Sequence, residues 1–333
     1  MRAPPLLFDH QGAVEAALAG LFDARSDLPL YRMMRYQLGW LGQDGAPKTG
    51  PVPDRLYGAV CMEAAGRDAP HARIAAAAAE LLYQSALVHE EMQTADGPSG
   101  EHPAVWWLWG PAQAINVGDG LHALARLALL DAEQEMSATQ TLQAVSLLDA
   151  SALRYYEGHY LDLTYQERLD VTEAQYVAMA SAKRGALFGA AAALGALAAG
   201  YPSETVQALQ AFGEALGLAA QMRDDVNDLW PSTPAAHPRA LNKSKLLPIV
   251  HAFERAPLPQ KRALGEAYFK RVLTPADLDA VRAILEETGS RAYAEEKAQR
   301  TAQEALAALD GVGLPPKRVK RWQEVAAALT GEG

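Results

Sequence analysis

The sequence predicts an all-α protein built as one large helical bundle. Alanine runs at residues 75–79 and 190–193 and plentiful leucine favour helix, because both residue types have high helix propensity. Apolar side chains recur at helical spacing, whereas sustained alternation of β-branched residues is hard to find. With 333 residues, half of them hydrophobic, the chain can bury a large core. Because no linker or internal repeat divides the sequence, we predict a single domain over residues 1–333.

Predicted helices and breaker segments alternate through the first half of the chain. We expect helices over residues 11–21, 30–41, 55–66, 70–91, 121–131 and 137–165. Glycine and proline cluster in residues 42–53 and 94–103, and both residue types disfavour helix. These two segments are therefore expected to connect helices.

The second half begins with a long helix predicted over residues 172–199. Thr172 and Gln175 form a capping-box pattern at its start. The next helix stops at Pro231, and a second breaker segment follows over residues 231–238. Residues 242–245 then introduce another helix, and about three amphipathic helices finish the chain.

Charge, cysteine content and the chain start exclude several classes of protein. The formal net charge of −10 argues against a nucleic-acid-binding protein, which needs concentrated lysine and arginine. The single cysteine, Cys61, excludes an internal disulfide framework and suits a reducing compartment. The start lacks a secretory pattern, and the small-residue run at 185–200 is too short to span a bilayer. We therefore expect a cytoplasmic protein without a stable membrane anchor.

Residues 221–230 place three carboxylates inside an otherwise apolar helical pattern. Asp224 and Asp228 lie about 40° apart around a helix, one turn from each other, and Asp225 flanks them. Stacked carboxylates repel unless a cation lies between them, and Mg²⁺ takes oxygen ligands. The alternative is an exposed acidic helix end. The apolar run at 185–200 favours a buried helix and hence a metal site.

Several further motifs occur in an order and spacing that match one known family. They cover residues 31–40, 105–125, 157–162, 176–187, 194–200, 221–230 and 242–250. On these motifs the chain resembles the trans-isoprenyl diphosphate synthase (polyprenyl synthetase) superfamily, and in particular terpene synthases built on the same fold.

The resemblance implies an all-α bundle of the isoprenoid synthase type, with two acidic helices facing each other across a deep apolar cavity. It further implies a homodimer and a prenyl diphosphate substrate held by Mg²⁺, with three ions when diphosphate is bound. Breaking an allylic carbon–oxygen bond yields a carbocation and a diphosphate anion. The site must therefore neutralise the leaving group and keep water from the cation.

The resemblance also assigns the metal ligands. Asp224, Asp225 and Asp228 correspond to the family's second aspartate-rich motif, which is intact. Glu90 and Glu91 correspond to the first motif, whose third acid is absent. We expect both glutamates to bind metal; the alternative is an exposed helix terminus at the unfavourable end of the helix dipole.

Basic and amide side chains complete the predicted site. Lys183, together with the three aspartates, is assigned to catalysis, although Arg184 replaces the family's threonine beside it. His159 stands where the family has glutamine, with a hydrogen-bonded structural histidine as the alternative. The residues assigned to the diphosphate substrate are Lys183, Arg223, Lys243, Lys245, Gln221 and His159.

The second substrate site of the family, for isopentenyl diphosphate, lacks its basic residues here. The family's arginine pair corresponds to Ser99 and Gly100, and its early basic stretch to residues 50–55. An anionic diphosphate needs cations to replace its hydration. We therefore expect a class I terpene synthase that ionises a C15–C20 or longer prenyl diphosphate and cyclises or rearranges the cation. One alternative is a chain-elongating prenyltransferase of the farnesyl or geranylgeranyl diphosphate synthase type; another is a non-catalytic or regulatory subunit.

Overall fold

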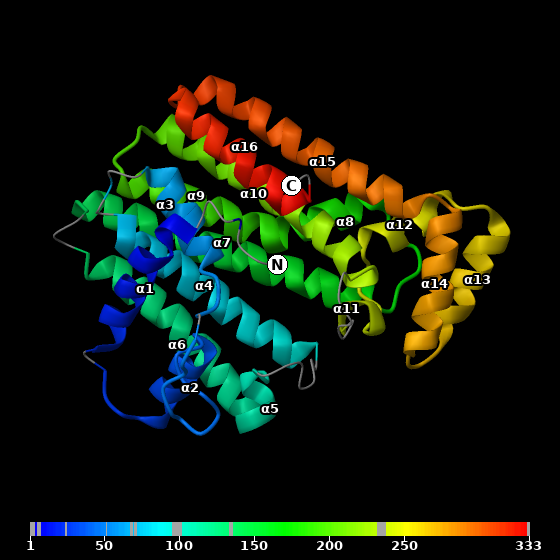
Figure 1. The fold of residues 1–333 in the computed structure, drawn as a ribbon, viewed down its shortest axis with the longest axis horizontal. Helices are drawn as coiled ribbons and strands as arrows, with labels where there is room; N and C mark the ends of the chain where they lie inside the picture. Colours follow the sequence, from blue (N-terminus) through cyan, green and yellow to red (C-terminus); the bar gives the residue numbers. More distant parts are fainter. Residues whose placement is uncertain are drawn as a thin grey trace.

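The computed structural model confirms the all-α prediction (Figure 1). It describes residues 4, 8–23, 25–50, 52–66, 69, 72–94, 102–132, 136–231 and 238–331. Within these ranges the only β-type pairing is an isolated bridge between Leu41 and Pro47. No helix in this part of the chain combines the length and apolar character needed to cross a bilayer.

The helices follow one another along the chain, with the longest connection between α2 and α3. The first half contains α1 (Phe8–Asp23), α2 (Pro29–Gln37), α3 (Leu56–Ala65), α4 (Ala72–Gln93), α5 (Val105–Trp109), α6 (Pro111–Leu130) and α7 (Ala138–Tyr165). The second half contains α8 (Glu173–Ala180), the π-helical segment η2 (Ser181–Gly185), α9 (Ala186–Ala198), α10 (Ser203–Leu229), α11 (Pro238–Leu241), α12 (Leu247–Arg255), α13 (Leu258–Phe269), α14 (Pro275–Glu287), α15 (Ser290–Ala308), the 3₁₀ segment η3 (Leu309–Val312) and α16 (Pro316–Thr330).

The predicted start of α6 is wrong by ten residues. We expected this helix to begin at residue 121, after a glycine-containing stretch, but it begins at Pro111. An added Cβ at Gly118 would lie 2.2 Å from His89 Nε2, and one at Gly120 would lie 2.1 Å from Met34 Cε. These glycines therefore permit close packing of α6 against α4 and α2 and do not interrupt the helix.

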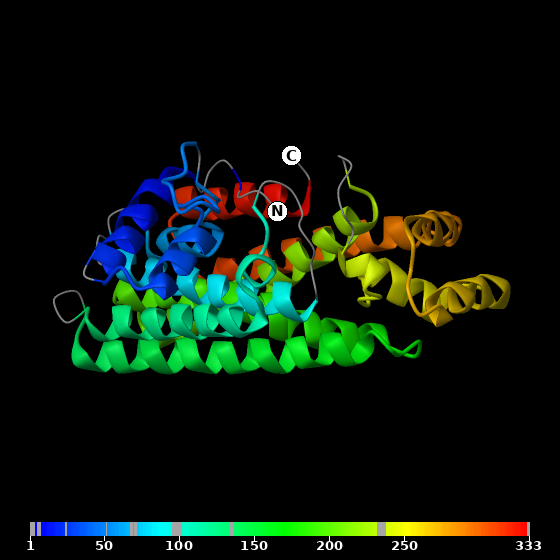
Figure 2. The same ribbon diagram turned by 90° about the horizontal axis from the view of Figure 1, so that it is seen from below.

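Helix α9 lies at the centre of the bundle and packs against α3, α4, α7 and α10. It is buried over its whole length, which its composition of alanine, glycine and leucine allows. In Figure 2, the long helix α7 runs along one edge of the molecule, with α6 beside it. A second, smaller apolar core joins α12, α13 and α14 to the end of α10. Both views show α13 and α14 at one end of the molecule.

Candidate active site

The site begins at η2, which interrupts the helix predicted over residues 172–199. The capping box of Thr172 and Gln175 is present at the start of α8, as predicted. Eight residues of α-helix follow, and the chain then widens into one π-helical turn that contains Lys183 and Arg184. Such π-turns are uncommon and recur at functional sites.

Two glycines on neighbouring helices make room for this turn. An added Cβ at Gly158 of α7 would lie 2.7 Å from the backbone N of Lys183. One at Gly217 of α10 would lie 2.8 Å from the carbonyl O of Arg184. Any larger residue would force the elements apart. The two glycines therefore allow α7 and α10 to enclose η2 and hold its two cations inside the bundle.

Lys183 links acidic residues from two other helices. Its Nζ donates to Glu90 Oε1 of α4 at 2.9 Å and to Asp162 Oδ2 of α7 at 2.6 Å, and the lysine side chain is only 6% exposed. Tyr155 Oη donates to Glu90 Oε2 at 3.0 Å. Burial raises the pKa of Glu90, but the charges of Lys183 and His159 and the hydrogen bond from Lys183 outweigh it and lower the pKa to about 2. Glu90 is therefore ionised at neutral pH.

The same cluster has the donor atoms for a divalent cation. Ligand atoms of Glu90, His159 and Asp162 lie within 4.8 Å of one another. Asp162 Oδ1 is buried and has no hydrogen-bond partner among the described residues. His159 is held by Gln93, with 2.5 Å between its Nε2 and Gln93 Oε1. Carboxylate oxygens are the ligands that Mg²⁺ prefers, so Asp162, with one oxygen not engaged among the described residues, fits this ion best.

Asp225, which was predicted to bind metal, is engaged by hydrogen bonds within the protein. It is completely buried, and both of its carboxylate oxygens already accept hydrogen bonds. The donors are Tyr176 Oη at 2.7 Å, Gln221 Nε2 at 2.8 Å, Arg239 Nη2 at 2.8 Å and the backbone N of Leu247 at 2.9 Å. Asp225 therefore anchors α8, α11 and α12 to α10, and Gln221 supports it.

Asp224 and Asp228 lie on a different part of α10. Arg184 Nη1 donates to Asp224 Oδ2 and forms an ion pair with it. Asp228 Oδ2 accepts the backbone N–H of Ala240 in α11 at 2.9 Å. Of the three predicted aspartates, only Asp224 lines the cavity described below.

Two other predicted residues also point away from that cavity. Arg223 Nη1 lies 3.8 Å from Glu295 Oε1 of α15, on another face of α10. Glu91 follows Glu90 by one residue, which turns its side chain by about 100° around α4. Glu91 lies close enough to Tyr36 to affect that residue: burial, and then the charge of Glu91, raise the pKa of Tyr36 to about 12. Neither residue lines that cavity, and the roles predicted for them, with diphosphate for Arg223 and with metal for Glu91, stay predictions.

The two predicted lysines after the second breaker segment are also used elsewhere. Lys243 has a left-handed backbone with φ of 62°, and its Nζ donates to the carbonyl O of Lys270. Lys245 is buried, and its Nζ donates to the carbonyl oxygens of Gln166 at 3.0 Å and Lys243 at 2.9 Å. It also lies 5.0 Å from the ring centroid of Tyr268. In the structure both side chains make these other contacts, and their predicted contact with diphosphate stays a prediction.

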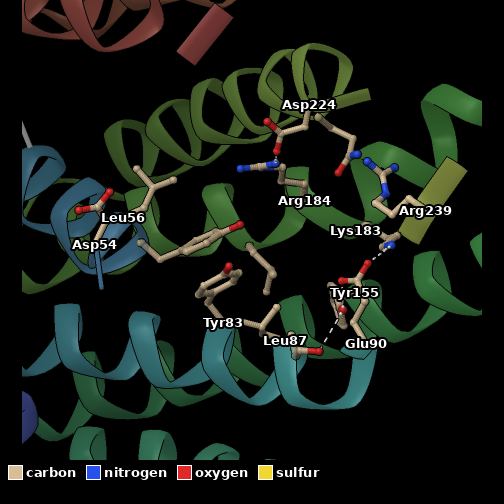
Figure 3. Close-up of a pocket in the computed structure, with 14 residues that line it drawn as sticks. Asp54, Leu56, Tyr83, Leu87, Glu90, Tyr155, Lys183, Arg184, Asp224 and Arg239 are labelled. Carbon is tan, nitrogen blue, oxygen red and sulfur yellow. Dashed lines mark hydrogen bonds and ion pairs between the residues drawn. The ribbon is translucent and has the colours of Figure 1, made fainter. Parts of the chain in front are cut away.

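The residues that do converge surround a cavity of about 200 Å³ (Figure 3). Its lining consists of Asp54, Leu56, Tyr57, Tyr83, Ala86, Leu87, Glu90, Tyr155, Lys183, Arg184, Leu187, Gln221, Asp224 and Arg239. In Figure 3, Glu90, Lys183 and Arg239 lie near one another at one end, while Leu56 and Tyr83 lie toward the other. The cavity thus has a cluster of charged residues at one end and leucine and tyrosine side chains along its wall, with Asp54 beside Leu56 at the other end.

Sequence reasoning missed Arg239 and Arg184, which line the cavity, and Asp162, which pairs with Lys183. Arg239 directly follows the breaker segment, where there is no helical periodicity from which to predict the direction of its side chain. Arg184 was noted only as a replacement for threonine. Asp162 lies three residues after His159, so both occupy one face of α7, and this spacing was the signal that could have found it.

Only part of the predicted second substrate site lies within the described residues. Ser99 and Gly100 lie outside the described residues. Arg55 is fully buried, and its Nε donates to Glu15 Oε1 at 2.6 Å and its Nη2 to the carbonyl O of Leu38 at 2.5 Å. Arg55 therefore holds α1 and α2 against α3.

Comparison with known proteins gives relatives that cover nearly the whole chain. A geranylgeranyl diphosphate synthase of Mycobacterium tuberculosis is 31% identical over 296 residues, which are 86% of this chain and 83% of the relative. A (2E,6E)-farnesyl diphosphate synthase of the same species is 29% identical over 313 residues, 91% of this chain and 86% of the relative. The crystal structure of a polyprenyl synthetase from Streptomyces coelicolor is 27% identical, with a TM-score of 0.86 over 97% of this chain and 98% of its own.

These relatives are named as farnesyl and geranylgeranyl diphosphate synthases. Such enzymes are chain-elongating prenyltransferases, and our prediction of a cyclising terpene synthase as the main function is therefore wrong. The comparisons favour the first alternative that the sequence left open. The model of the polyprenyl synthetase family matches residues 56–286, which include α4, η2 and α10 and the cavity residues Glu90, Lys183, Arg184, Asp224 and Arg239. This chain belongs to the polyprenyl synthetase family.

Proposed function

We propose that this protein is a prenyltransferase that extends an allylic prenyl diphosphate with isopentenyl diphosphate. The observation that carries the proposal is that three cations, Lys183, Arg184 and Arg239, line one cavity together with the acids Glu90 and Asp224 and with leucine and tyrosine side chains. The similarity to farnesyl and geranylgeranyl diphosphate synthases over most of the chain supports the same activity.

The charged end suits a diphosphate leaving group. Lys183 is a buried ammonium: burial lowers its pKa, but Asp162 and Glu90 raise it above the usual value. Arg239 is likewise kept charged, since burial lowers its pKa and the neighbouring aspartates raise it. Fixed cations in a site that excludes water stabilise a developing anion strongly. When bound, Mg²⁺ would supply further charge neutralisation to the leaving diphosphate.

The metal would be held by acids from two sides of this end. We propose Glu90 and Asp162 on one side and Asp224 on the other, with three ions when diphosphate is present. The buried Asp162 Oδ1 without a hydrogen-bond partner among the described residues supports the first group. Asp228 lies one turn beyond Asp224, and we retain it as a ligand through water.

The apolar wall protects the reacting carbon chain. Tyr57 and Tyr83 stack with their ring centroids 4.2 Å apart, and Leu56, Leu87 and Leu187 complete this side of the cavity. Such a lining accommodates an isoprenoid chain and would keep bulk water from the reacting carbon. Aromatic faces also stabilise a cation that passes near them.

The decisive experiment supplies the purified protein with Mg²⁺ and geranyl, farnesyl or geranylgeranyl diphosphate, with and without isopentenyl diphosphate. We expect longer prenyl diphosphates only when isopentenyl diphosphate is present. Lys183→Met should abolish them, because the leaving group loses its buried ammonium. Hydrocarbon or alcohol formed from one allylic diphosphate alone would contradict the proposal.

The homodimer that the resemblance implies gains support from an exposed apolar face. Leu142, Leu153 and Tyr160 of α7 are 67%, 60% and 69% exposed, and their spacing places them within about 20° on one side of the helix. Ile115 and Leu130 of the neighbouring α6 are 45% and 43% exposed. We propose that a second copy covers this face. Leu153→Glu should give a monomer in light scattering, whereas an unchanged mass would exclude this interface.

A non-catalytic subunit is the second candidate function. One observation favours it: Glu90, Asp162, Asp224 and Asp225 are each ion-paired with a lysine or an arginine. The assay above separates the two functions. A subunit would show no turnover by itself, and Asp224→Ala would leave the activity of its partner unchanged.

A further inference from the structure

Arg184 and Asp224 form an ion pair within the cavity, where a metal would otherwise bind. The Arg184 side chain is 14% exposed and that of Asp224 is 22% exposed, so little water screens the pair. The guanidinium carbon also lies 5.7 Å from the ring centroid of Phe188. Burial lowers the pKa of Arg184, but the charge of Asp224 raises it above its usual value. Arg184 is therefore positively charged and committed to Asp224 in the absence of ligands.

This pairing sets a condition for metal binding. The Asp224 oxygen that accepts the guanidinium is not available to a metal ion at the same time. The neighbouring cations do not change this, because Arg239 is paired with Asp225, and Lys183 with Glu90. A metal ion at Asp224 would displace Arg184 and break the ion pair of a buried guanidinium, which is costly.

A diphosphate removes this cost. It brings negative charge into the same cavity and offers oxygens that accept hydrogen bonds from a guanidinium in bidentate geometry. Only the side chain needs to move, because the backbone of Arg184 is fixed by the close contact of its carbonyl with Gly217. The four-bond side chain of arginine lets the guanidinium turn within the cavity.

We propose that Arg184 is an exchangeable counter-ion: it neutralises Asp224 in the empty enzyme and transfers to the substrate's diphosphate, which frees Asp224 for Mg²⁺. This inference rests on the proposed function, since it assumes a diphosphate ligand. It makes binding of metal and of diphosphate mutually favourable. Diphosphate takes Arg184 away from Asp224, which the metal needs, and the metal takes Asp224 away from Arg184, which the diphosphate needs. The side chain that replaces threonine beside Lys183 would thus order the assembly of the site.

The test measures two affinities by calorimetry with the full-length protein. Mg²⁺ is titrated alone, and inorganic diphosphate is titrated in the presence of EDTA. In Arg184→Gln we expect Mg²⁺ to bind about tenfold more tightly, because Asp224 is free, and diphosphate to bind about tenfold more weakly. Arg184→Lys, which keeps the charge but loses the bidentate geometry, serves as the matched variant and should fall between wild type and Arg184→Gln for both ligands.

Asp224→Asn tests the other side of the exchange. This variant releases Arg184 from its pair, so diphosphate in EDTA should bind severalfold more tightly than to wild type. The proposal is overturned if both affinities of Arg184→Gln move in the same direction or do not change, or if Asp224→Asn shows no gain. These measurements need no turnover. Opposite shifts without any chain elongation would therefore refute the proposed function and leave the exchange intact.

Discussion

Gly158 should be a sensitive position, because it packs directly against the segment that carries Lys183. A methyl group at this position would lie 2.7 Å from the backbone N of Lys183, 2.8 Å from Ala182 Cβ and 2.9 Å from the carbonyl C of Ala182. Two of these atoms belong to the backbone of η2 and cannot rotate away. Gly158→Ala must therefore push η2 from α7 and move the Lys183 ammonium relative to Glu90.

The size of the effect follows from two opposing contributions. Overpacking against backbone costs up to about 3 kcal/mol, while alanine in place of glycine inside a helix gains about 1 kcal/mol. We expect a net loss of about 2 kcal/mol. With about 2.1 cal/mol/K of unfolding entropy per residue over 333 residues, this loss lowers the melting temperature by about 3 °C. Misplacing Lys183 should also lower kcat by at least about tenfold.

Gly265→Ala is the matched control. Gly265 also lies inside a helix, α13, but an added Cβ there would meet no atom within 4 Å. Only the gain in helix propensity remains, so this variant should be slightly more stable than wild type and equally active. Calorimetric melting and a steady-state elongation assay measure both variants. Equal stability and activity of Gly158→Ala and Gly265→Ala would refute the role of close packing around η2.

Three further predictions concern acid, the metal cluster and metal removal. The buried Glu63 has a pKa lowered to about 2, because hydrogen bonds and charges from His10 and Arg321 outweigh the effect of burial. Urea unfolding should show wild type about 3 kcal/mol more stable than Glu63→Gln above pH 4.5, and this difference should disappear as the pH falls toward 2. A stability difference that stays constant across this range would contradict the assignment. Asp162→Asn should weaken Mg²⁺ binding by about tenfold in calorimetry, and unchanged affinity would exclude this oxygen as a ligand. EDTA should stop elongation and excess Mg²⁺ should restore it; activity that persists in EDTA would count against a metal-dependent leaving group.

The helices were predicted well where their signals are local. The capping boxes at Thr172 and Ser137 mark the starts of α8 and α7, and each needs only residues within three positions. The start of α6 was missed because Gly118 and Gly120 are helix glycines that serve packing against distant helices. The π-turn at η2 has no local sequence signal either. Its cause is the close approach of α7 and α10, which is a tertiary property.

The site was predicted less completely, because residue type does not reveal the direction of a side chain. Asp224 and Asp225 are adjacent and chemically identical, yet Asp224 faces the cavity and Asp225 is sealed by donors from α8, α11 and α12. Those donors are up to 49 residues away in sequence. Arg239 enters the site only because α11 folds back onto α10, where Asp228 accepts the N–H of Ala240.

The role of Lys245 can be tested, because a lysine buried for structural reasons and a lysine that binds diphosphate predict different measurements. Burial, and then the charge of Lys243, lower the pKa of Lys245 from 10.5 to about 8. Between these two values the unfolded chain binds more protons than the folded one, so stability rises with pH through this window. Compared with Lys245→Met, wild type should therefore gain up to about 3 kcal/mol of unfolding free energy between pH 8 and pH 10.5.

A lysine that instead contacts the diphosphate would behave differently. In that case Lys245→Met would weaken binding of inorganic diphosphate, and the stability difference between the two proteins would not follow the titration of a buried amine. The structure predicts unchanged diphosphate affinity, because the Nζ is directed to the carbonyl oxygens of Gln166 and Lys243. Weaker diphosphate binding with a pH-independent stability difference would restore the role first assigned to Lys245 and contradict its structural one.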